Sequence, residues 1–473
     1  MLSLCVAAIA QTISFNPFEL KNDKGGVIAT GELGSLKVPE NRKKPHGTTV
    51  EIAVFRLRTR ASKPGVPIVY LAGGPGGSGV ETAKGDALAL FETLAQQADV
   101  ILLDQRGTGR SKPSLMCPEK LDLPLDKPET RAAMQAAAQE WSAKCASVLA
   151  SQNIDVAAYN TVESADDIED LRRALAVPQL DLLAHSYGTH LALSVLRRHP
   201  ESIHRAVLAG VEGPDDTLKL PANIQAQLEQ IGKLIAADPY WNSRIPDFIG
   251  LTRSLLDKLD KEPVSVTATH PRTNEKAAVA FGKLDLQLVL ASGIGNRRAI
   301  EFYPLTVYQL SRGEYDVFAR NTFLFRTAPR RVSAMTFACD CSSGASAERR
   351  RLIEEQAPHT LLGDAVDFQI QSACAAWKIP DAGGEFRSPV SSKTPTLFVS
   401  GTLDGRTPPS NAAAIARGFS HAQQLVAANA THVDLLAATA ITDKIAEFLS
   451  GKDIGNVTVE IPPPQFRRAN TAP

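Results

Sequence analysis

Apolar residues form several short runs in the first half of the chain, and segments with helical spacing separate many of them. In residues 48–58 apolar and polar residues alternate, which is typical of a strand with one buried face, and residues 29–39 are its expected partner. Apolar residues fill nearly every position of 67–71, 100–103 and 180–184, as in strands that are covered on both faces. Strands that alternate with helices predict a mostly parallel sheet with helices on both sides.

The pattern changes after Gly213. Helical spacing dominates up to about residue 390, and the strand TPTLFVSG then restores the first pattern. We therefore expect one α/β core, formed by residues 11–212 and 393–450, and a large, mainly helical insertion at 213–392 that covers it as a cap. The remaining residues 451–473 are rich in proline and are expected to form a tail.

Composition narrows the classes of function. The chain has 51 basic and 51 acidic residues, and a formal net charge of zero argues against nucleic acid as a partner of the whole protein. Hydrophobic residues make up 44% and charged residues 22%, which are the values of a globular protein and not of a disordered chain. No apolar stretch reaches about 18 residues, so we expect no membrane-spanning helix.

The first ten residues are mostly apolar and end in the pattern Ala8-x-Ala10, which resembles the cleavage site of a short secretory signal segment. A secreted or periplasmic protein is therefore expected, and a frayed terminus or a misplaced start is the alternative. Of six cysteines, Cys5 lies in this segment, and the others allow two disulfides and one free thiol whose pairing the spacing does not fix. Cys339-x-Cys341 lacks a matching ligand pair at zinc spacing, so no metal site is expected.

The strongest candidate for chemistry is the sequence AHSYG at residues 184–188, which follows an apolar strand and opens a helix. It matches the nucleophile elbow G-x-S-x-G with alanine in place of the first glycine. Small residues at 184 and 188 allow a tight turn that exposes the hydroxyl of Ser186 and directs the helix N-terminus at the reaction centre. Ser186 is therefore the predicted nucleophile.

A serine nucleophile needs a base, and the base needs an acid that orients it. In α/β-hydrolases these residues follow the chain order Ser, Asp or Glu, then His. Asp404 comes just after one late strand and His432 after the next, whereas His421 precedes that strand on the wrong side of the sheet. The predicted triad is Ser186, Asp404 and His432, with a turn aspartate and a loop histidine as the alternative interpretations of the last two.

Two backbone N–H groups must stabilise the oxyanion of an acyl-transfer reaction. One is expected from Tyr187, the residue after the nucleophile, and the other from Gly73 or Gly74 in the loop LAGGPGGSG. The same loop matches G-x-G-x-x-G in outline, with Asp104 at the end of the next strand. A dinucleotide site would leave the predicted triad unexplained, so no cofactor is expected.

Five segments, LAGGPGGSG, DQRGTGRS, AHSYGTHLAL, GTLDGRTPP and THVDLL, together resemble the tripeptidyl aminopeptidase and prolyl aminopeptidase branch of the α/β-hydrolases. The resemblance covers about residues 30–450 and implies an α/β-hydrolase fold with a helical cap, serine exopeptidase activity without a metal, and frequent export. It also implies that Cys117 pairs with Cys145, and Cys374 with Cys339 or Cys341. Two departures from the family pattern make it less safe to infer this chain's substrate from the family. Ala72 replaces a histidine common in prolyl enzymes, and Ala184 replaces the elbow glycine.

We therefore expect a serine hydrolase, most simply an exported aminopeptidase that releases short N-terminal peptides or proline through an acyl-enzyme on Ser186. Such an enzyme must recognise a free α-ammonium group. Glu212, Asp215 and Asp216, at the entry to the cap, are candidates, with an ordinary polar loop as the alternative. An esterase of small esters with the same triad is the alternative function, and a non-catalytic binding protein on this scaffold is a third. The motifs leave the oligomeric state open.

Overall fold

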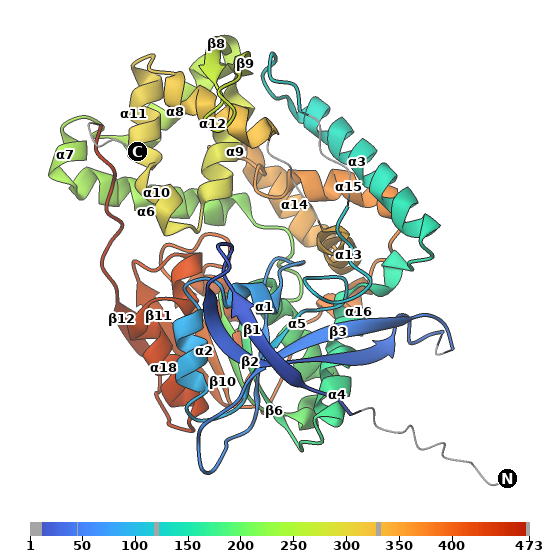
Figure 1. Ribbon diagram of the computed structural model, residues 1–473. Helices are drawn as coiled ribbons and strands as arrows, with labels where there is room; N and C mark the ends of the chain where they lie inside the picture. The colour runs from blue at the N-terminus through green and yellow to red at the C-terminus, as the bar shows by residue number, and fades with distance from the viewer. Residues whose placement is uncertain (1–11, 45, 118–122, 328–332, 470–473) are drawn as a thin grey trace, which may run out of the picture.

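One sheet organises the α/β part of the protein. The computed structural model describes residues 12–44, 46–117, 123–327 and 333–469, so the expected signal segment at 1–10 lies outside the described residues. Within these ranges ten strands form a sheet in the order β1-β2-β3-β5-β4-β6-β7-β10-β11-β12 (Figure 1). They are β1 (Asn16–Lys21), β2 (Val27–Pro39), β3 (Thr49–Leu57), β4 (Ile68–Leu71), β5 (Val100–Leu103), β6 (Leu180–His185), β7 (Ile203–Ala209), β10 (Thr396–Gly401), β11 (Ala422–Ala428) and β12 (Val457–Glu460).

The pairing of the strands confirms a mostly parallel sheet. Antiparallel pairs join β1 to β2, β2 to β3 and β3 to β5, and all the other pairs are parallel. Every residue of β4 and β5 is buried, as their continuous apolar sequences predict. Because side chains alternate along a strand, Val69 and Leu71 of β4 join one hydrophobic cluster, and Ile68 and Tyr70 join the other.

Helices cover both faces of the sheet. The first cluster is completed by α4 (Thr161–Ala174), α5 (Tyr187–Arg198) and α17 (Pro409–Ala416), and the second by α2 (Leu88–Leu94) and α18 (Thr439–Leu449). Short helical turns, α1 (Gly79–Thr82), η1 (Val156–Ala158), η2 (Pro200–Ser202) and η4 (His432–Leu436), occupy the loops. This arrangement and the strand order are those of an α/β-hydrolase core.

The stretch between β7 and β10 forms a second, mainly helical layer above one edge of the sheet (Figure 1), which we call the cap (residues 213–392). It has a hydrophobic cluster of its own. Its elements are α6 (Pro221–Ala237), α7 (Pro239–Asn242), α8 (Phe248–Lys261), β8 (Val264–Thr269), β9 (Lys276–Phe281), α9 (Lys283–Gly293), α10 (Arg297–Glu301), α11 (Tyr303–Ser311), α12 (Asp316–Thr327), α13 (Ala334–Ser343), α14 (Ala347–Gln356), η3 (Ala357–His359), α15 (Phe368–Trp377) and α16 (Gly383–Arg387).

Two segments are not where the sequence analysis placed them: α3 (Arg131–Ser151) was expected in the core, and residues 451–473 were expected to form only a tail. Helix α3 comes from the expected core stretch but lies beside α15 of the cap (Figure 1), where the rings of Trp141 and Trp377 are 6.4 Å apart. The expected tail contributes β12, and residues 461–469 then run along the cap. The apolar spacing of α3 predicts a helix but not the layer it joins, and β12 has only four residues, too few for a clear strand signal.

Two disulfides are present among the described cysteines. Cys117 is bonded to Cys145 of α3, and Cys341 of α13 is bonded to Cys374 of α15. Cys339 carries a free, buried thiol. The structure thus selects Cys341 over Cys339 as the partner of Cys374, a choice that the sequence left open.

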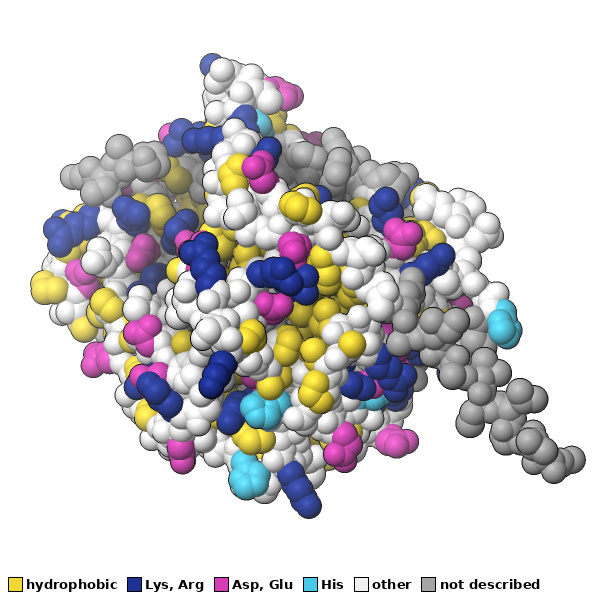
Figure 2. Space-filling model, turned by 60° about the horizontal axis from the view of Figure 1, so that its bottom comes forward, with side chains coloured by type: hydrophobic (Ala, Val, Ile, Leu, Met, Phe, Trp, Pro, Cys, Tyr) yellow, Lys and Arg dark blue, Asp and Glu magenta, His cyan; other side chains and the backbone are white. Residues whose placement is uncertain are grey.

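Charged side chains of both signs are intermixed on the face shown in Figure 2, as expected for a chain with no net charge. Across the described residues, none of the helices combines the length and the apolar character that a membrane span requires.

Candidate active site

The loops at the carboxyl ends of β4, β6, β7, β10 and β11 meet at the edge of the sheet that faces the cap, where open α/β sheets bind their ligands. Strand β6 ends at His185 and α5 begins at Tyr187, so Ser186 alone forms the turn between them. Its φ of 57° is strained for a residue other than glycine. A Cβ at Gly188 would overlap the carbonyl oxygen of Leu71, which explains why a small residue is needed there.

His432 and Asp404 form a buried pair next to this turn. The Nδ1 of His432 donates a hydrogen bond of 2.7 Å to an oxygen of Asp404. The carboxylate also accepts bonds of 3.0 Å from the backbone N–H groups of Arg406 and Thr407. Burial alone would raise the pKa of Asp404, but the charge of His432 and these hydrogen bonds outweigh it and hold the pKa below its ordinary value. Asp404 is therefore a carboxylate, ready to stabilise a histidine cation.

Thr407 is a site residue that the sequence analysis missed. Its hydroxyl donates a hydrogen bond of 2.6 Å to Asp404 and lies 3.0 Å from the Nδ1 of His432. The hydroxyl thus touches both members of the pair and fixes their relative position. The sequence did hold a signal for this role. Thr407 comes three residues after Asp404 in a predicted turn, where a threonine hydroxyl can bond to the aspartate.

The Ser186 hydroxyl makes no hydrogen bond within the described residues, and His432 Nε2 is likewise unpaired there. Two contacts nevertheless bring the turn and the histidine together. The backbone N–H of Ser186 bonds to Ala209 of β7, and a Cβ at the next residue, Gly210, would lie 3.0 Å from the His432 ring. The hydrogen bond between a catalytic serine and its histidine is often long in ligand-free enzymes and shortens when substrate binds.

The glycine loop after β4 lies against the nucleophile. A Cβ at Gly73 would be 2.8 Å from the Cβ of Ser186, so glycine lets this backbone approach. As the first residue of α5, Tyr187 has a backbone N–H with no partner inside the helix. Asp104 orders the loop, because it accepts hydrogen bonds from the Ser78 hydroxyl (2.5 Å) and from the N–H of Val80 (3.0 Å). Of the three residues expected to bind the oxyanion, Gly73 and Tyr187 thus lie directly beside Ser186, and Gly74 follows Gly73 in the same loop.

His185 precedes the nucleophile but is arranged as a support. Its Nε2 is 3.0 Å from the backbone oxygen of His432, which only accepts, so this nitrogen carries the proton. Burial and the charge of His432 lower the pKa of His185 to about 3. The ring is therefore neutral, and it lies 4.6 Å from the His432 ring without adding a second charge to the site.

The three carboxylates proposed for a substrate amine are already engaged by the protein. Glu212 is 4% exposed and pairs with the ammonium of Lys219 at 2.7 Å. Asp216 pairs with Arg349 at 2.5 Å, and Asp215 accepts two hydrogen bonds from Ser346 at the start of α14. Asp215 and Asp216 thus join the segment that follows β7 to α14 within the cap, and of the three only Glu212 belongs to a buried cluster of charges.

That cluster contains Glu212, Lys219, Asp340 and Asp367. Asp340 is 7% exposed, and no donor among the described residues hydrogen-bonds its carboxylate. Burial and the charges of Glu212 and Asp367 raise the pKa of Asp340 well above its ordinary value, although Lys219 opposes this. Sequence reasoning missed Asp340, because only the packing of α13 brings it here.

Helix α13 places Asp340 close to the nucleophile. Thr336, one turn earlier on the same helix, donates a hydrogen bond of 2.7 Å to the backbone oxygen of Pro75 in the glycine loop. Cys339, the neighbour of Asp340, accepts a bond of 3.1 Å from the hydroxyl of Tyr187. Asp340 therefore follows, by one helical turn, the residue of α13 that contacts the glycine loop.

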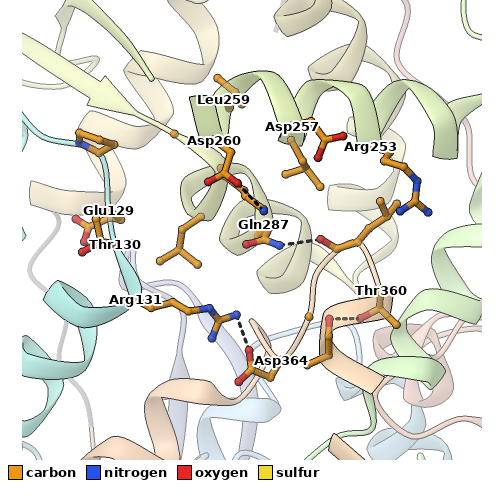
Figure 3. Close-up of a pocket in the computed structure, with 18 of the residues that line it drawn as sticks. Glu129, Thr130, Arg131, Arg253, Asp257, Leu259, Asp260, Gln287, Thr360 and Asp364 are labelled. Carbon is orange, nitrogen blue, oxygen red and sulfur yellow. Dashed lines mark hydrogen bonds and ion pairs between the residues drawn. The ribbon is translucent and has the colours of Figure 1, made fainter. Parts of the chain in front are cut away.

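A separate cavity of about 750 Å³ lies between the cap and the start of α3 (Figure 3). Its wall is charged, but Arg131 pairs with Asp364 at 2.5 Å and Lys283 with Asp260 at 2.9 Å. None of the residues predicted for the site lines it. In the part of the chain that is described, no group of three or more histidine, cysteine, aspartate or glutamate side chains is arranged to hold a metal ion.

Comparisons with known proteins agree with this geometry. The α/β hydrolase fold family model matches residues 66–260, which include Ser186, and the TAP-like protein model matches residues 359–455, which include Asp404 and His432. Serine protease Hip1 of Mycobacterium tuberculosis is 22% identical to this chain over 426 residues, 85% of the chain and 81% of that protein.

Two further relatives have different names. A tripeptidyl aminopeptidase of Streptomyces coelicolor is 28% identical over 219 residues, 43% of this chain and 39% of that protein. Carboxylesterase B of Mycobacterium tuberculosis is 24% identical over 414 residues, 82% of this chain and 78% of that protein. The two family matches, together with the sheet topology, show that the chain belongs to the TAP-like group of the α/β-hydrolase fold family.

Proposed function

We propose that this protein is a serine peptidase that cleaves peptides near a free N-terminus, with Ser186, His432 and Asp404 as its triad. Relatives named serine protease and tripeptidyl aminopeptidase support a peptidase. The preference for a free amine rests on the buried carboxylate of Asp340, on the helix that contacts the glycine loop through Thr336, because no donor among the described residues hydrogen-bonds this carboxylate and a substrate ammonium group could do so.

In the proposed reaction, the Nε2 of His432 takes the proton of the Ser186 hydroxyl while Oγ attacks the scissile carbonyl carbon. Asp404 holds the imidazole through Nδ1 and stabilises its positive charge. The proton then passes to the leaving amine as the C–N bond breaks, which leaves an acyl-enzyme. Water attacks the ester, gives one proton to His432, and the proton returns to Oγ as the acid product leaves.

The oxyanion of each tetrahedral intermediate forms next to the Ser186 turn. Backbone N–H groups of Tyr187 and of Gly73 or Gly74 are the proposed donors, and the positive end of the α5 dipole adds to their effect. Asp104 keeps the glycine loop in place through Ser78 and Val80, so these donors are oriented before substrate arrives.

The substrate amine is proposed to bind in the cluster of Glu212, Asp340 and Asp367. The three carboxylates face one internal cation, Lys219, whose ammonium bonds to Glu212 and to two backbone oxygens. An α-ammonium group beside Asp340 would supply the missing charge and hydrogen bonds. Glu212 thus keeps a proposed role in amine recognition, because its negative charge adds to that of the site, whereas Asp215 and Asp216 join the start of the cap to α14.

The deciding experiment compares substrates that differ only at the N-terminus. Tripeptidyl and prolyl anilides, the same compounds with an acetylated amine, and simple aryl esters are tested with the wild type and with Ser186→Ala. We expect hydrolysis of the free anilides, loss of at least about tenfold in kcat/KM on acetylation, and no activity in the variant.

Equal cleavage of free and acetylated peptides would overturn the amine requirement and leave an endopeptidase or an esterase. Cleavage of esters alone would favour the activity named in the carboxylesterase relative. Export is a further part of the proposal. Two disulfides support it, since such bonds persist mainly in oxidising compartments.

A further inference from the structure

The cap contacts both loops that carry the proposed base and acid. The backbone oxygen of Gly295, between α9 and α10, accepts a hydrogen bond of 3.2 Å from Val433, the residue after His432. The oxygen of Ile294 accepts a bond of 3.2 Å from the side chain of Arg406, close to Asp404. A Cβ at Gly295 would lie 3.0 Å from the Cβ of His432, so the cap backbone lies directly against the histidine.

Arg297, the first residue of α10, binds the His432 loop on both sides of the histidine. Its Nε is 3.1 Å from both oxygens of Asp434, two residues after His432. Its Nη2 donates a bond of 2.8 Å to the oxygen of Asn429, three residues before His432. One planar guanidinium therefore bridges the loop, a geometry that suits arginine and not lysine.

Asp434 passes this restraint on to the residue beside His432. Its carboxylate accepts hydrogen bonds from the N–H (2.8 Å) and the hydroxyl (2.7 Å) of Thr431. These bonds close the turn on which His432 lies, and Arg297 neutralises the carboxylate that makes them. Without the guanidinium of Arg297, the half-buried carboxylate of Asp434 would stay charged but have no positive partner, which is unfavourable.

The remaining donor of Arg297 reaches the C-terminal segment. Its Nη1 donates a bond of 3.0 Å to the oxygen of Pro462, just after β12. Residues 462–469 continue along the cap (Figure 1), where the N–H groups of Gln465 and Arg467 bond to Glu301 of α10. Arg297 thus joins three parts of the chain that are far apart in sequence: the cap, the His432 loop and the C-terminal segment.

From these contacts we propose that Arg297 is a positioning residue for the general base, so that the cap contributes to the chemical step as well as to substrate binding. The inference rests on the proposed role of His432. With Arg297 in place, the turn at 429–434 holds the imidazole against Asp404 and toward Ser186. When the guanidinium is lost, the turn relaxes and the imidazole spends less time in that position.

The test uses Arg297→Ala and Arg297→Gln, with Arg298→Ala as the matched control. Arg298 is the next residue, its side chain is 86% exposed, and its nearest carboxylate, Asp86, is 3.9 Å away. The readouts are the rate at which a fluorophosphonate labels Ser186, and kcat and KM for an aryl ester or anilide that the wild type cleaves. Circular dichroism shows whether each variant is folded, and the glutamine variant serves if the alanine variant is not.

We expect both Arg297 variants to lose at least about tenfold in labelling rate and in kcat, with KM changed by less than about threefold. Millimolar guanidinium should restore part of the rate of Arg297→Ala and none in Arg298→Ala. Equal rates in the Arg297 and Arg298 variants would overturn the inference, and so would a rise in KM with unchanged kcat. His432→Ala distinguishes failure of this inference from failure of the proposed function. If Ser186 of this variant is labelled as fast as in the wild type, the proposed function itself is wrong.

Discussion

One cluster of buried charge includes Asp167 of α4 and another includes Asp340 of α13, and the two differ in how completely their charges are paired. In the first, Arg106 is fully buried and makes bonds of 2.8 and 2.7 Å to Asp167, with further bonds to backbone oxygens of Glu40 and Ala158. Arg42 donates a further bond of 2.7 Å to Oδ1 of Asp167, the oxygen that also accepts from Nη2 of Arg106. Each charge in this cluster thus has its partners within the protein.

The second cluster, around Lys219, leaves one member unpaired. Glu212 and Asp367 receive hydrogen bonds from Lys219, but Asp340 receives none from the described residues. A fully bonded cluster has nothing left to offer a ligand, whereas an unpaired buried carboxylate is costly and is retained where something else binds it. The first cluster therefore fits a structural role, and the second fits the binding role that we propose for it.

The largest expected effect tests the structural role. Arg106→Ala removes the fully buried cation, leaves Asp167 with Arg42 alone and deprives two backbone oxygens of this donor, so we expect the free energy of unfolding to fall by about 3–5 kcal/mol. Arg110→Ala is the control, since Arg110 lies on the same loop with an exposed side chain and should cost less than about 1 kcal/mol. Urea denaturation measures both. A loss in Arg106→Ala no larger than in the control would break the comparison.

The second effect tests the binding role. Asp340→Asn removes a charge and keeps the shape, so we expect KM for free-amine peptides to rise by about 10- to 100-fold, or about 1.4–2.7 kcal/mol. Acetylated peptides and esters should be unaffected, and the protein should be no less stable. Steady-state kinetics with exposed Asp257→Asn as control measures this. Equal losses on free and acetylated substrates would assign Asp340 to the fold instead.

The contrast also explains what sequence reasoning could and could not reach. Ser186, Asp404 and His432 each follow a strand of the sheet, and the apolar residues of these strands and their order are visible in the sequence. The sheet was predictable for the same reason. The glycine loop was recognisable because close backbone approach demands glycine at defined positions.

The cap residues had no such signal. Arg297 and the helix of Asp340 contact loops more than a hundred residues away, and these contacts depend on how helices pack, which apolar spacing does not specify. The position of α3 beside the cap was not predicted for the same reason, because it too depends on how helices pack. Asp215 and Asp216 were reasonable candidates for binding a substrate amine because they are acidic. Only the structure shows that Ser346 and Arg349 already occupy them.

A smaller effect is expected in the pH dependence of stability. Because the pKa of Asp340 is raised in the folded protein, the folded state binds this proton more tightly than the unfolded state. Stability from this residue is fully present below the unfolded pKa of about 3.9 and is lost as the pH rises through the raised value, by at most about 1.4 kcal/mol per pH unit.

Asp340→Asn should lack this dependence, so the difference in unfolding free energy between wild type and variant should change with pH in this direction. Thermal or urea denaturation of the substrate-free proteins at several pH values measures it. A difference that stays constant from pH 3 to 8 would mean that Asp340 is paired in solution, and the second cluster would then resemble the first.

The smallest effect concerns the residue that links the two clusters. The Tyr187 hydroxyl contacts Thr161 of α4 at 3.0 Å and Cys339 of α13 at 3.1 Å, and these helices carry Asp167 and Asp340. Tyr187→Phe removes the hydroxyl but keeps the backbone N–H, so we expect a loss of about 1 kcal/mol in stability and a kcat within about threefold of wild type. A rise in KM for free-amine peptides alone would show that the well-paired cluster helps to place Asp340, and the two clusters would have to be treated as one.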